Sequence, residues 1–321
     1  MNTLNRRLKC CVTAGTASLF FCLGSLDAQA QCAVTAANSA SFGTVTSFTV
    51  RTALQSSSTT NSGLTCSGAI VEGVLANEIN MTSSSQNSGN LRSSTGDAIP
   101  YLIYADPNAT IQIDPGRVNW ASGQLRSALN IFGGPLQSLP LFFRTIPGAN
   151  VAAGTYTDTI TLNWAWNYCR SRLLRSCLAR DQGSGTSTIT LTLVVTNDCT
   201  IAAPDISFGD APNPGSFSPV TGGIAVTCTK GLTYTVGVSS GSFRAANGRR
   251  QMASGDGRLQ YDIFNGGGAT VWGQDTNRVS SVSAADGSSA QQFPFVAAIY
   301  ADQETPPVGT YTDSVVIDVR Y

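Results

Sequence analysis

The sequence contains no histidine, and charged residues make up only 12% of its 321 positions. Without an imidazole, nucleophile systems built on Ser–His or Cys–His pairs are excluded. Lys230 is the only lysine after the first 30 residues, so a lysine base is hardly available. Basic and acidic residues balance at 19 each, which leaves no overall positive field for nucleic acid. We therefore expect neither an enzyme nor a nucleic-acid-binding protein, and we expect no cofactor.

Residues 1–30 have the pattern of a secretory signal peptide. A positively charged start precedes an apolar stretch from position 11 to 26, and Ala28-Gln29-Ala30 forms an A-x-A cleavage site. The mature chain should then begin at Gln31. The apolar stretch is short for a membrane span, so we expect a protein that is exported past the inner membrane.

Six of the nine cysteines lie beyond this signal. An even number of cysteines in an exported chain favours disulfide bonds. A metal site is the weaker interpretation, because the chain has neither a histidine nor a CxxC motif. We therefore expect no bound metal.

An internal repeat divides the remaining chain into two homologous domains, which we place at 31–196 and 197–321. The segments that recur in the same order are Ser41-Phe42-Gly43 and Ser207-Phe208-Gly209, residues 101–104 and 261–264, and residues 154–160 and 309–315. The cysteines follow the same order, and the disulfides that we expect are Cys32–Cys66, Cys199–Cys228 and a local Cys169–Cys177 bridge.

The pattern of side chains predicts β-structure in both repeats. Apolar or aromatic residues occupy most alternate positions in 156–168, 189–195 and 311–321, which is typical of half-buried strands. Many short strands between Gly, Pro, Asn and Ser turns indicate β-sandwiches. Asp158 and Asp313 occupy equivalent places in the two repeats, and we expect a structural corner role for them rather than catalysis.

Several motifs of the second domain resemble those of the spore coat protein U domain family. They are Gly223 to Cys228, Arg250-Gln251-Met252, Leu259-Gln260-Tyr261, Val271-Trp272-Gly273 and the terminal Gly-x-Tyr-x-Asp strand. The first domain keeps only the ends of this pattern. The resemblance implies a subunit of an archaic, Csu-type chaperone–usher pilus. Such subunits have immunoglobulin-like folds that lack their last strand, which a chaperone and then a neighbouring subunit supply.

The ends of the two domains differ, and the difference indicates a tip subunit. In the first domain, residues 188–196 follow the Gly-Thr-Tyr-Thr-Asp strand and look like a covalently attached donor strand. In the second domain the equivalent strand ends the sequence at Tyr321, so we expect an open groove lined by Val315, Ile317 and Val319. The alternative is a normal sandwich whose edge is its final strand. Gln31-Cys32 leaves no room for a donor segment, so this subunit should donate to no other.

The strand at 189–195 leads toward the second domain, so the connection that enters it, 164–187, should lie at the opposite, distal pole. It contains Trp166, Tyr168 and Leu173-Leu174, and the Cys169–Cys177 bridge should stiffen it and lower the ordering cost of contact. Alternatively, the two leucines fold back onto the domain.

Counting strands places a second distal loop at 125–135, with Leu129, Ile131 and Phe132 as contact residues. The alternative is a strand end with Ile131 and Phe132 in the core. Residues 80–95 form a third, more polar candidate. These loops should bind abiotic or host surfaces by burying apolar area, weakly for each tip but with avidity from many pili, and should promote biofilm formation.

The resemblance also implies the partners: a periplasmic chaperone, an outer-membrane usher and an adjacent pilin that donates a strand. It places the protein at the cell surface, at a pilus tip. A structural spore-coat or surface-layer protein and a non-adhesive pilus cap are the main alternatives. A carbohydrate-binding module is a further one, although aromatic residues on alternating strands are more often core. Its candidate stacking residues are Trp120, Trp164, Trp166 and Trp272.

Overall fold

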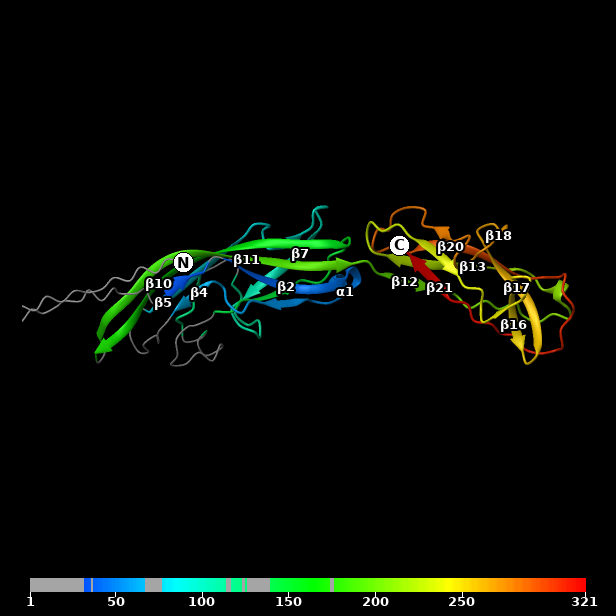
Figure 1. Cartoon of the computed structure of the whole chain (residues 1–321), viewed down its shortest axis with the longest axis horizontal. Coiled ribbons are helices and arrows are strands. Elements are labelled where there is room, and N and C mark those ends of the chain that lie inside the picture. The colour runs from blue at the N-terminus through cyan, green and yellow to red at the C-terminus, as the bar shows by residue number, and fades with distance from the viewer. Residues whose placement is uncertain are drawn as a thin grey trace, which may run out of the picture. The chain divides into compact units, whose positions relative to one another are not determined.

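The computed structural model describes residues 32–35, 37–66, 77–113, 117–122, 125, 139–173 and 176–321. Their regular secondary structure is almost exclusively β-strand, and they build two tandem β-domains, each around its own apolar core (Figure 1). The expectation of an all-β chain with two sandwich-like domains is therefore confirmed. No helix in these ranges has the length and apolar character needed to cross a bilayer.

The first domain is organised around a long hairpin. Its elements are β1 (Cys32–Val34), β2 (Ala37–Thr46), α1 (Ser47–Thr52), β3 (Ser56–Ser58), β4 (Leu64–Cys66), β5 (Glu78–Ser85), β6 (Asn90–Arg92), β7 (Ala98–Tyr104), β8 (Arg117–Asn119), β9 (Phe142–Thr145), β10 (Gly154–Leu173) and β11 (Ser176–Thr196). The main sheet has the order β2-β11-β10-β6-β7-β9-β3, and β5 pairs with both β10 and β8. Strands β1 and β4 pair separately and carry the Cys32–Cys66 disulfide.

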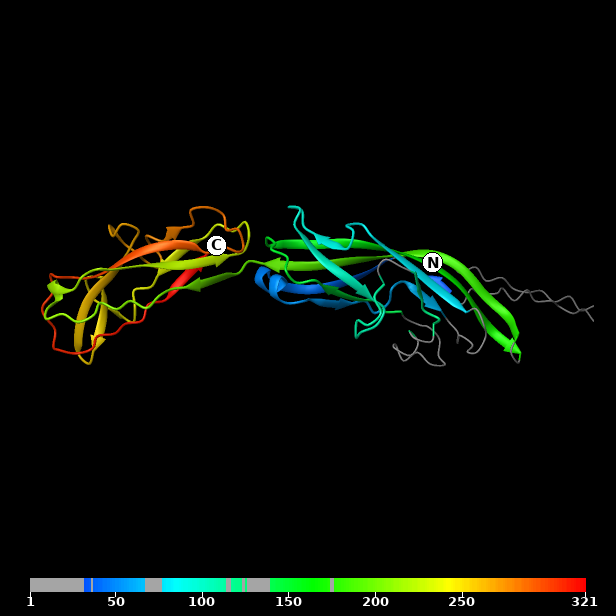
Figure 2. The ribbon, with the colours of Figure 1, turned by 180° about the vertical axis from the view of Figure 1, so that it is seen from behind.

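Strands β10 and β11 run antiparallel, and both views of the ribbon show them side by side (Figures 1 and 2). Their alternating sequence explains the hairpin, because successive residues of a strand point to opposite faces. The inward side chains of Ile160 and Leu162 are fully buried, whereas outward threonines such as Thr157 and Thr190 are exposed. The hairpin thus presents one continuous apolar face to the core.

The second domain forms two smaller sheets. Its elements are β12 (Cys199–Ala202), η1 (Pro214–Ser216), β13 (Val220–Cys228), β14 (Thr235–Val238), β15 (Phe243–Arg244), β16 (Arg250–Ser254), β17 (Gly257–Asn265), β18 (Thr270–Val271), β19 (Val279–Ser280), β20 (Gln291–Ile299) and β21 (Ile317–Arg320). The larger sheet has the order β12-β13-β20-β17-β16-β15, with β18 beside β17, and the smaller sheet has the order β19-β14-β21.

A buried ion pair lies within the larger sheet, between β16 and β17, and its arginine reaches the smaller sheet. The Arg250 guanidinium lies 2.8 Å from the Asp262 carboxylate, and both side chains are almost fully buried. Arg250 also donates hydrogen bonds to the carbonyls of Val238, Ser239 and Trp272. It therefore satisfies backbone acceptors of the smaller sheet from a position on the larger one.

The three expected disulfides are present, and the repeats share a polar corner. The Tyr101 hydroxyl donates to the Asp158 carboxylate at 2.6 Å, and the Tyr261 hydroxyl donates to Asp313 at 2.7 Å. Each aspartate also accepts the N–H of the following residue at 2.8 Å. Equivalent residues thus make equivalent bonds, which supports the homology of the domains and the structural role of both aspartates.

Candidate functional site

The first domain shows how a sandwich of this type is closed. Strand β11 lies between β10, with which it is antiparallel, and β2, with which it is parallel. Leu191, for example, is opposite Asp158 on one side and Ala40 on the other. The inward side chains of β11 are buried to at least 98%; they are Ile189, Leu191, Leu193 and Val195. Both edges of β11 are therefore paired, and β5 and β6 pair with the other edge of β10.

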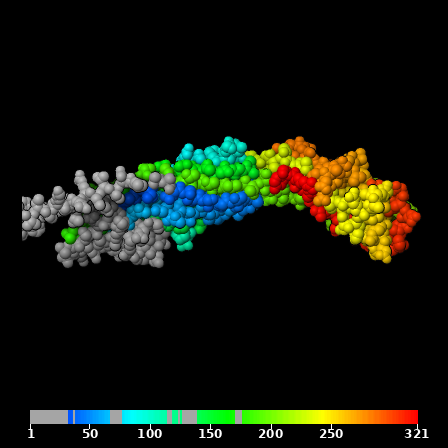
Figure 3. Space-filling model, in the orientation of Figure 1, coloured from blue at the N-terminus to red at the C-terminus, as the bar shows by residue number. Residues whose placement is uncertain are grey.

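The second domain contains the two flanking segments but no strand between them. Strand β21, which corresponds to part of β10, pairs with β14 on one edge only. Residues 203–210, which contain the counterpart of the Ser41-Phe42-Gly43 segment in β2, belong to no strand. Within 198–321, all of which the structure describes, no segment occupies the place of β11. The C-terminal residues lie open at the surface in Figure 3.

The exposure of side chains at equivalent positions differs accordingly between the two domains. Leu162 is fully buried, but its counterpart Ile317 is only partly buried. Trp166 is 8% exposed, whereas its counterpart Tyr321 is 64% exposed. The predicted groove residues Val315, Ile317 and Val319 pack along one edge of the core without being enclosed. An apolar row that remains accessible along an unpaired strand edge is suited to accept another strand.

Two further apolar residues lie on the segment that corresponds to β2, and the sequence pattern alone did not single them out as candidate groove residues. Ile206 and Phe208 are partly buried and pack against the same core as Ile317. In the first domain the counterpart of Phe208 is Phe42, which is only 7% exposed. The recurrence of the Ser-Phe-Gly segment contained this information, because the first copy lies beside β11.

Polar contacts hold β21 in an extended conformation. The Arg278 guanidinium lies 2.9 Å from the Asp318 carboxylate and donates to the Thr235 carbonyl of β14 at 2.8 Å. Arg320 lies 3.0 Å from the same carboxylate. Asp318 alternates with Ile317 and Val319, so these charges anchor the strand from the side that faces away from the groove.

The proposed contact residues at the hairpin end have different environments. Trp166 and Tyr168 are buried in the core and are not exposed contact residues, because they continue the inward-facing row of β10. Leu173 ends β10, but its side chain lies outside the described residues. The same holds for Leu174 and for Leu129, Ile131 and Phe132. The Cys169–Cys177 disulfide crosslinks the two strands near their turn.

The hairpin end lies far from the covalent connection to the second domain. Twenty residues of β10 at about 3.3 Å each give roughly 60 Å between its ends. Strand β5 begins beside this end, where the Cys169 N–H donates to the Asn77 side chain at 2.8 Å. Trp120, which precedes the 125–135 loop, donates its backbone N–H to the Ile79 carbonyl in the same region. The described flank of that loop is therefore close to the hairpin end.

The third candidate loop, 80–95, is not distal. Its first part is strand β5, and the turn that follows lies beside the middle of β10, where the Gln86 N–H donates to the Thr159 carbonyl. The expectation was wrong because pairing with β10 carries these residues away from the hairpin end. The four tryptophans are also buried, so none offers an exposed stacking surface; they are Trp120, Trp164, Trp166 and Trp272.

Comparisons with known proteins agree with this geometry. A family model described as the Spore Coat Protein U domain matches residues 19–163 and 185–318. A chain in the CsuC–CsuE chaperone–tip adhesion subunit pre-assembly complex, from the archaic chaperone–usher Csu pili of Acinetobacter baumannii, is 25% identical. The match covers 90% of this chain and 100% of that chain, with a TM-score of 0.63.

Two other structures have TM-scores that are too low to support any argument. A chaperone–tip adhesin complex of CFA/I fimbriae is 11% identical with a TM-score of 0.30, and covers 89% of this chain and 97% of that one. The CupB6 tip adhesin from Pseudomonas aeruginosa is 11% identical with a TM-score of 0.32, and covers 83% and 85%. No curated protein matches the chain.

Proposed function

The chain belongs to the Spore Coat Protein U domain family, and we propose that it is the tip subunit of a chaperone–usher pilus and mediates surface attachment. The observation that carries the proposal is the contrast between the domains. Strand β11 closes the first domain from within, while the corresponding place beside β21 is open in the second. The likeness to a chain of the Csu chaperone–tip adhesion subunit complex, over 90% of this chain, supports the same function.

The open groove is the assembly site in this proposal. A periplasmic chaperone, and later the adjacent pilin delivered at the outer-membrane usher, adds a strand beside β21. In the subunit-bound state that strand runs antiparallel to β21, as β11 runs relative to β10. Its alternate apolar side chains cover Val315, Ile317 and Val319 from one side and Phe208 from the other. Each side chain that becomes fully buried contributes about 1.5–3 kcal/mol before ordering costs.

The first domain supplies the attachment surface, and its distal loops make the contact. We assign the contact to Leu129, Ile131, Phe132, Leu173 and Leu174. Trp166 and Tyr168 are assigned to the core that supports the hairpin. The surface bound is apolar, either abiotic or on a host. Single tips bind it weakly, and many pili together give stable attachment and biofilm formation.

Attachment is tested by replacing Ile131, Phe132, Leu173 and Leu174 with serine in pili displayed on cells. We expect normal assembly but loss of attachment to polystyrene, because the loops no longer bury apolar area. Leu54→Ser is the matched control, since Leu54 is 51% exposed and belongs to none of these loops. Undiminished attachment of assembled pili would show that the subunit is a non-adhesive cap or binds elsewhere.

Assembly is tested separately by replacing Ile317 and Val319 with aspartate. Two carboxylates in the groove should prevent strand addition, so the chaperone complex should not co-purify and pili should lack this subunit. Val316→Asp is the control, because Val316 is 62% exposed on the same segment and lies out of the inward-facing row. Chaperone capture that survives the double substitution contradicts the assignment of the groove.

A further inference from the structure

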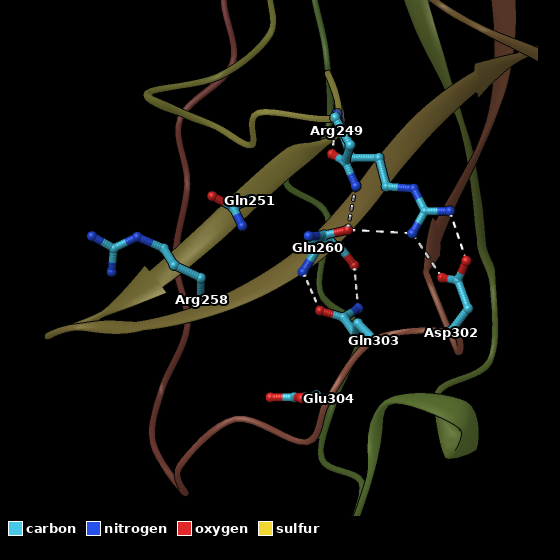
Figure 4. Close-up of a pocket in the computed structure, with 8 residues that line it drawn as sticks. Arg249, Gln251, Arg258, Gln260, Asp302, Gln303 and Glu304 are labelled. Atoms are coloured by element: carbon cyan, nitrogen blue, oxygen red, sulfur yellow. Dashed lines mark hydrogen bonds and ion pairs between the residues drawn. The ribbon is translucent and has the colours of Figure 1, made fainter.

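A polar hollow lies on the second domain, away from the groove. Its volume is about 520 Å³, and its walls come from the turn before β16, from β16 and β17, and from residues 302–304 between β20 and β21 (Figure 4). Val315, Ile317 and Val319 do not line it. The lining is made of amide, guanidinium and carboxylate side chains, so an apolar ligand would leave these groups without hydrogen bonds.

One wall of the hollow is fixed before any ligand arrives. The Gln303 amide accepts the Gln260 N–H at 2.6 Å and donates to the Gln260 and Tyr300 carbonyls at 2.8 and 2.7 Å. Arg249 forms a bidentate pair with Asp302 at 2.7 and 2.8 Å, and its guanidinium carbon is 3.6 Å from the centre of the Tyr300 ring. Groups that are already held in place lose little conformational freedom on binding.

Other groups around the hollow retain unused hydrogen-bonding capacity. Within 198–321, all of which the structure describes, the Gln251 amide and the Glu304 carboxylate make no side-chain hydrogen bond or ion pair. Arg258 uses one nitrogen, Nη1, for the carbonyls of Gly255 and Gly257. In Figure 4, Gln251 and Glu304 lie on different sides of the same hollow. A ligand with several hydroxyl groups could bond to both.

The charges around the hollow favour a neutral ligand. Arg249 and Arg258 are balanced by Asp302 and Glu304. The hydrogen bond from Arg249 lowers the pKa of Asp302, so this carboxylate is charged at neutral pH. An anion would meet the two carboxylates, and a cation would meet the two guanidinium groups.

An aromatic ring lies at the margin of the hollow. Phe243 is opposite Gln251 across β15 and β16, and Gln251 is opposite Gln260 across β16 and β17. Directly opposite residues share a face of the sheet, so these three side chains form a row. Phe243 is 39% exposed, and the guanidinium carbon of Arg258 lies over its ring, 5.1 Å from the ring centre. A partly exposed ring beside planar polar groups matches the two surfaces of a sugar, whose C–H face is apolar and whose rim carries hydroxyls.

We propose that this hollow binds a neutral oligosaccharide. Glu304 and Gln251 bond to its hydroxyls, Arg258 donates to its oxygens from its place over the Phe243 ring, and the part of this ring that remains exposed contacts the C–H face of a pyranose. The proposal goes beyond the proposed attachment function, because it adds a carbohydrate contact on the pilin-type domain to an apolar contact on the first domain. Much of the hollow is open to solvent and its bonds compete with water, so we expect a dissociation constant in the millimolar range.

The test is a saturation-transfer NMR titration of the purified full chain with cellotriose, maltotriose and triacetylchitotriose. The three probes separate β-linked glucans, α-linked glucans and N-acetylated sugars. We expect saturable binding of at least one probe. Glu304→Gln should weaken it about tenfold, and Gln251→Ala and Phe243→Ala should weaken it about fivefold, as expected for the loss of one contact. Gln86→Ala and Asp210→Asn, at exposed positions elsewhere, should leave binding unchanged.

Two outcomes overturn the proposal. One is the absence of saturable binding for all three probes. The other is binding that persists unchanged in both Glu304→Gln and Gln251→Ala, which places the sugar elsewhere. Thermal unfolding of each variant checks its fold, and Glu304→Gln keeps the size of the side chain. Attachment of the same variants to polystyrene should remain normal, so failure of this proposal and failure of the proposed function can be told apart.

Discussion

The repeat provides two positions at which the same substitution should have different costs. Leu162 in β10 and Ile317 in β21 are equivalent, but Leu162 is fully buried and Ile317 only partly. Replacing a fully buried leucine by alanine removes its transfer free energy and leaves a cavity, which together cost about 2–5 kcal/mol. At Ile317 part of the side chain is already exposed, so its truncation leaves no closed cavity. We therefore expect Ile317→Ala to cost about 1–2 kcal/mol.

Closing the groove should abolish this difference. The closing strand can be taken from the chain itself, by extending the sequence after Tyr321 with a short Gly-rich turn and a copy of residues 184–196. In the first domain this segment lies antiparallel to β10 with its apolar residues inward. In the extended chain Ile317 becomes enclosed, and Ile317→Ala should cost about 2–5 kcal/mol, as Leu162→Ala does.

The measurement is urea unfolding of five proteins. Four are the natural and extended chains, each with and without Ile317→Ala. The fifth, Leu162→Ala in the natural chain, identifies the transition of the first domain, because it should shift that transition alone. An open edge at β21 is contradicted if Ile317→Ala costs the same in both backgrounds, or if the extension fails to stabilise the second domain. Either result would mean that the second domain is already complete and that β21 is an ordinary edge strand.

Three further predictions test the framework of both domains. Arg250→Ala leaves Asp262 buried without its partner, so the free energy of unfolding of the second domain should fall by about 3–5 kcal/mol in urea unfolding. Arg249→Ala breaks an exposed pair and should lower it by at most about 1 kcal/mol. Equal losses for the two variants would contradict this prediction. Burial and the hydrogen bond to Asp262 raise the pKa of Tyr300 to about 12. Because the pKa of Tyr300 in the folded protein lies above the ordinary value, protonated Tyr300 stabilises the second domain. This contribution to the free energy of unfolding is complete below pH 10 and is lost as the pH rises toward 12. Tyr300→Phe should therefore reduce the loss of melting temperature between pH 10 and 12, and an unchanged slope would argue against it. Cys177→Ser opens the short hairpin loop and should lower the stability of the first domain by about 2–3 kcal/mol, measured by calorimetry; an unchanged unfolding transition would show that the bridge is dispensable.

Local periodicity and the repeat predicted most of the fold. Period two in 156–168 and 189–195 follows directly from the pleat of a strand, and both segments lie in β10 and β11. The order of cysteines in the repeats predicted the disulfides, because homologous sandwiches keep equivalent pairs. These features depend on residues that are close in sequence or duplicated, so one chain suffices to find them.

The predictions that were wrong depended on contacts between segments that lie far apart in the sequence. Tyr168 belongs to the same alternating row as Ile160, but its place near the turn suggested exposure. The structure covers it with β1, whose Cys32 sulfur lies 3.6 Å from the Tyr168 hydroxyl, and with Asp181 of β11 at 3.3 Å. Nothing in local periodicity shows that a strand 136 residues earlier lies there. The polar hollow could not be predicted from the sequence for the same reason, since its walls come from separate segments.

The contrast between the domains also determines where free energy can be gained during assembly. Strand β11 forms with the first domain and leads directly into β12, so the stability of the first domain does not depend on a partner strand. The second domain has an unpaired edge beside β21 and a partly exposed apolar row. In the proposed assembly, an added strand would therefore couple the folding free energy of this domain to fibre formation. Substitutions in the core of the first domain should act equally before and after assembly, whereas those along β21 should act mainly on the assembled state.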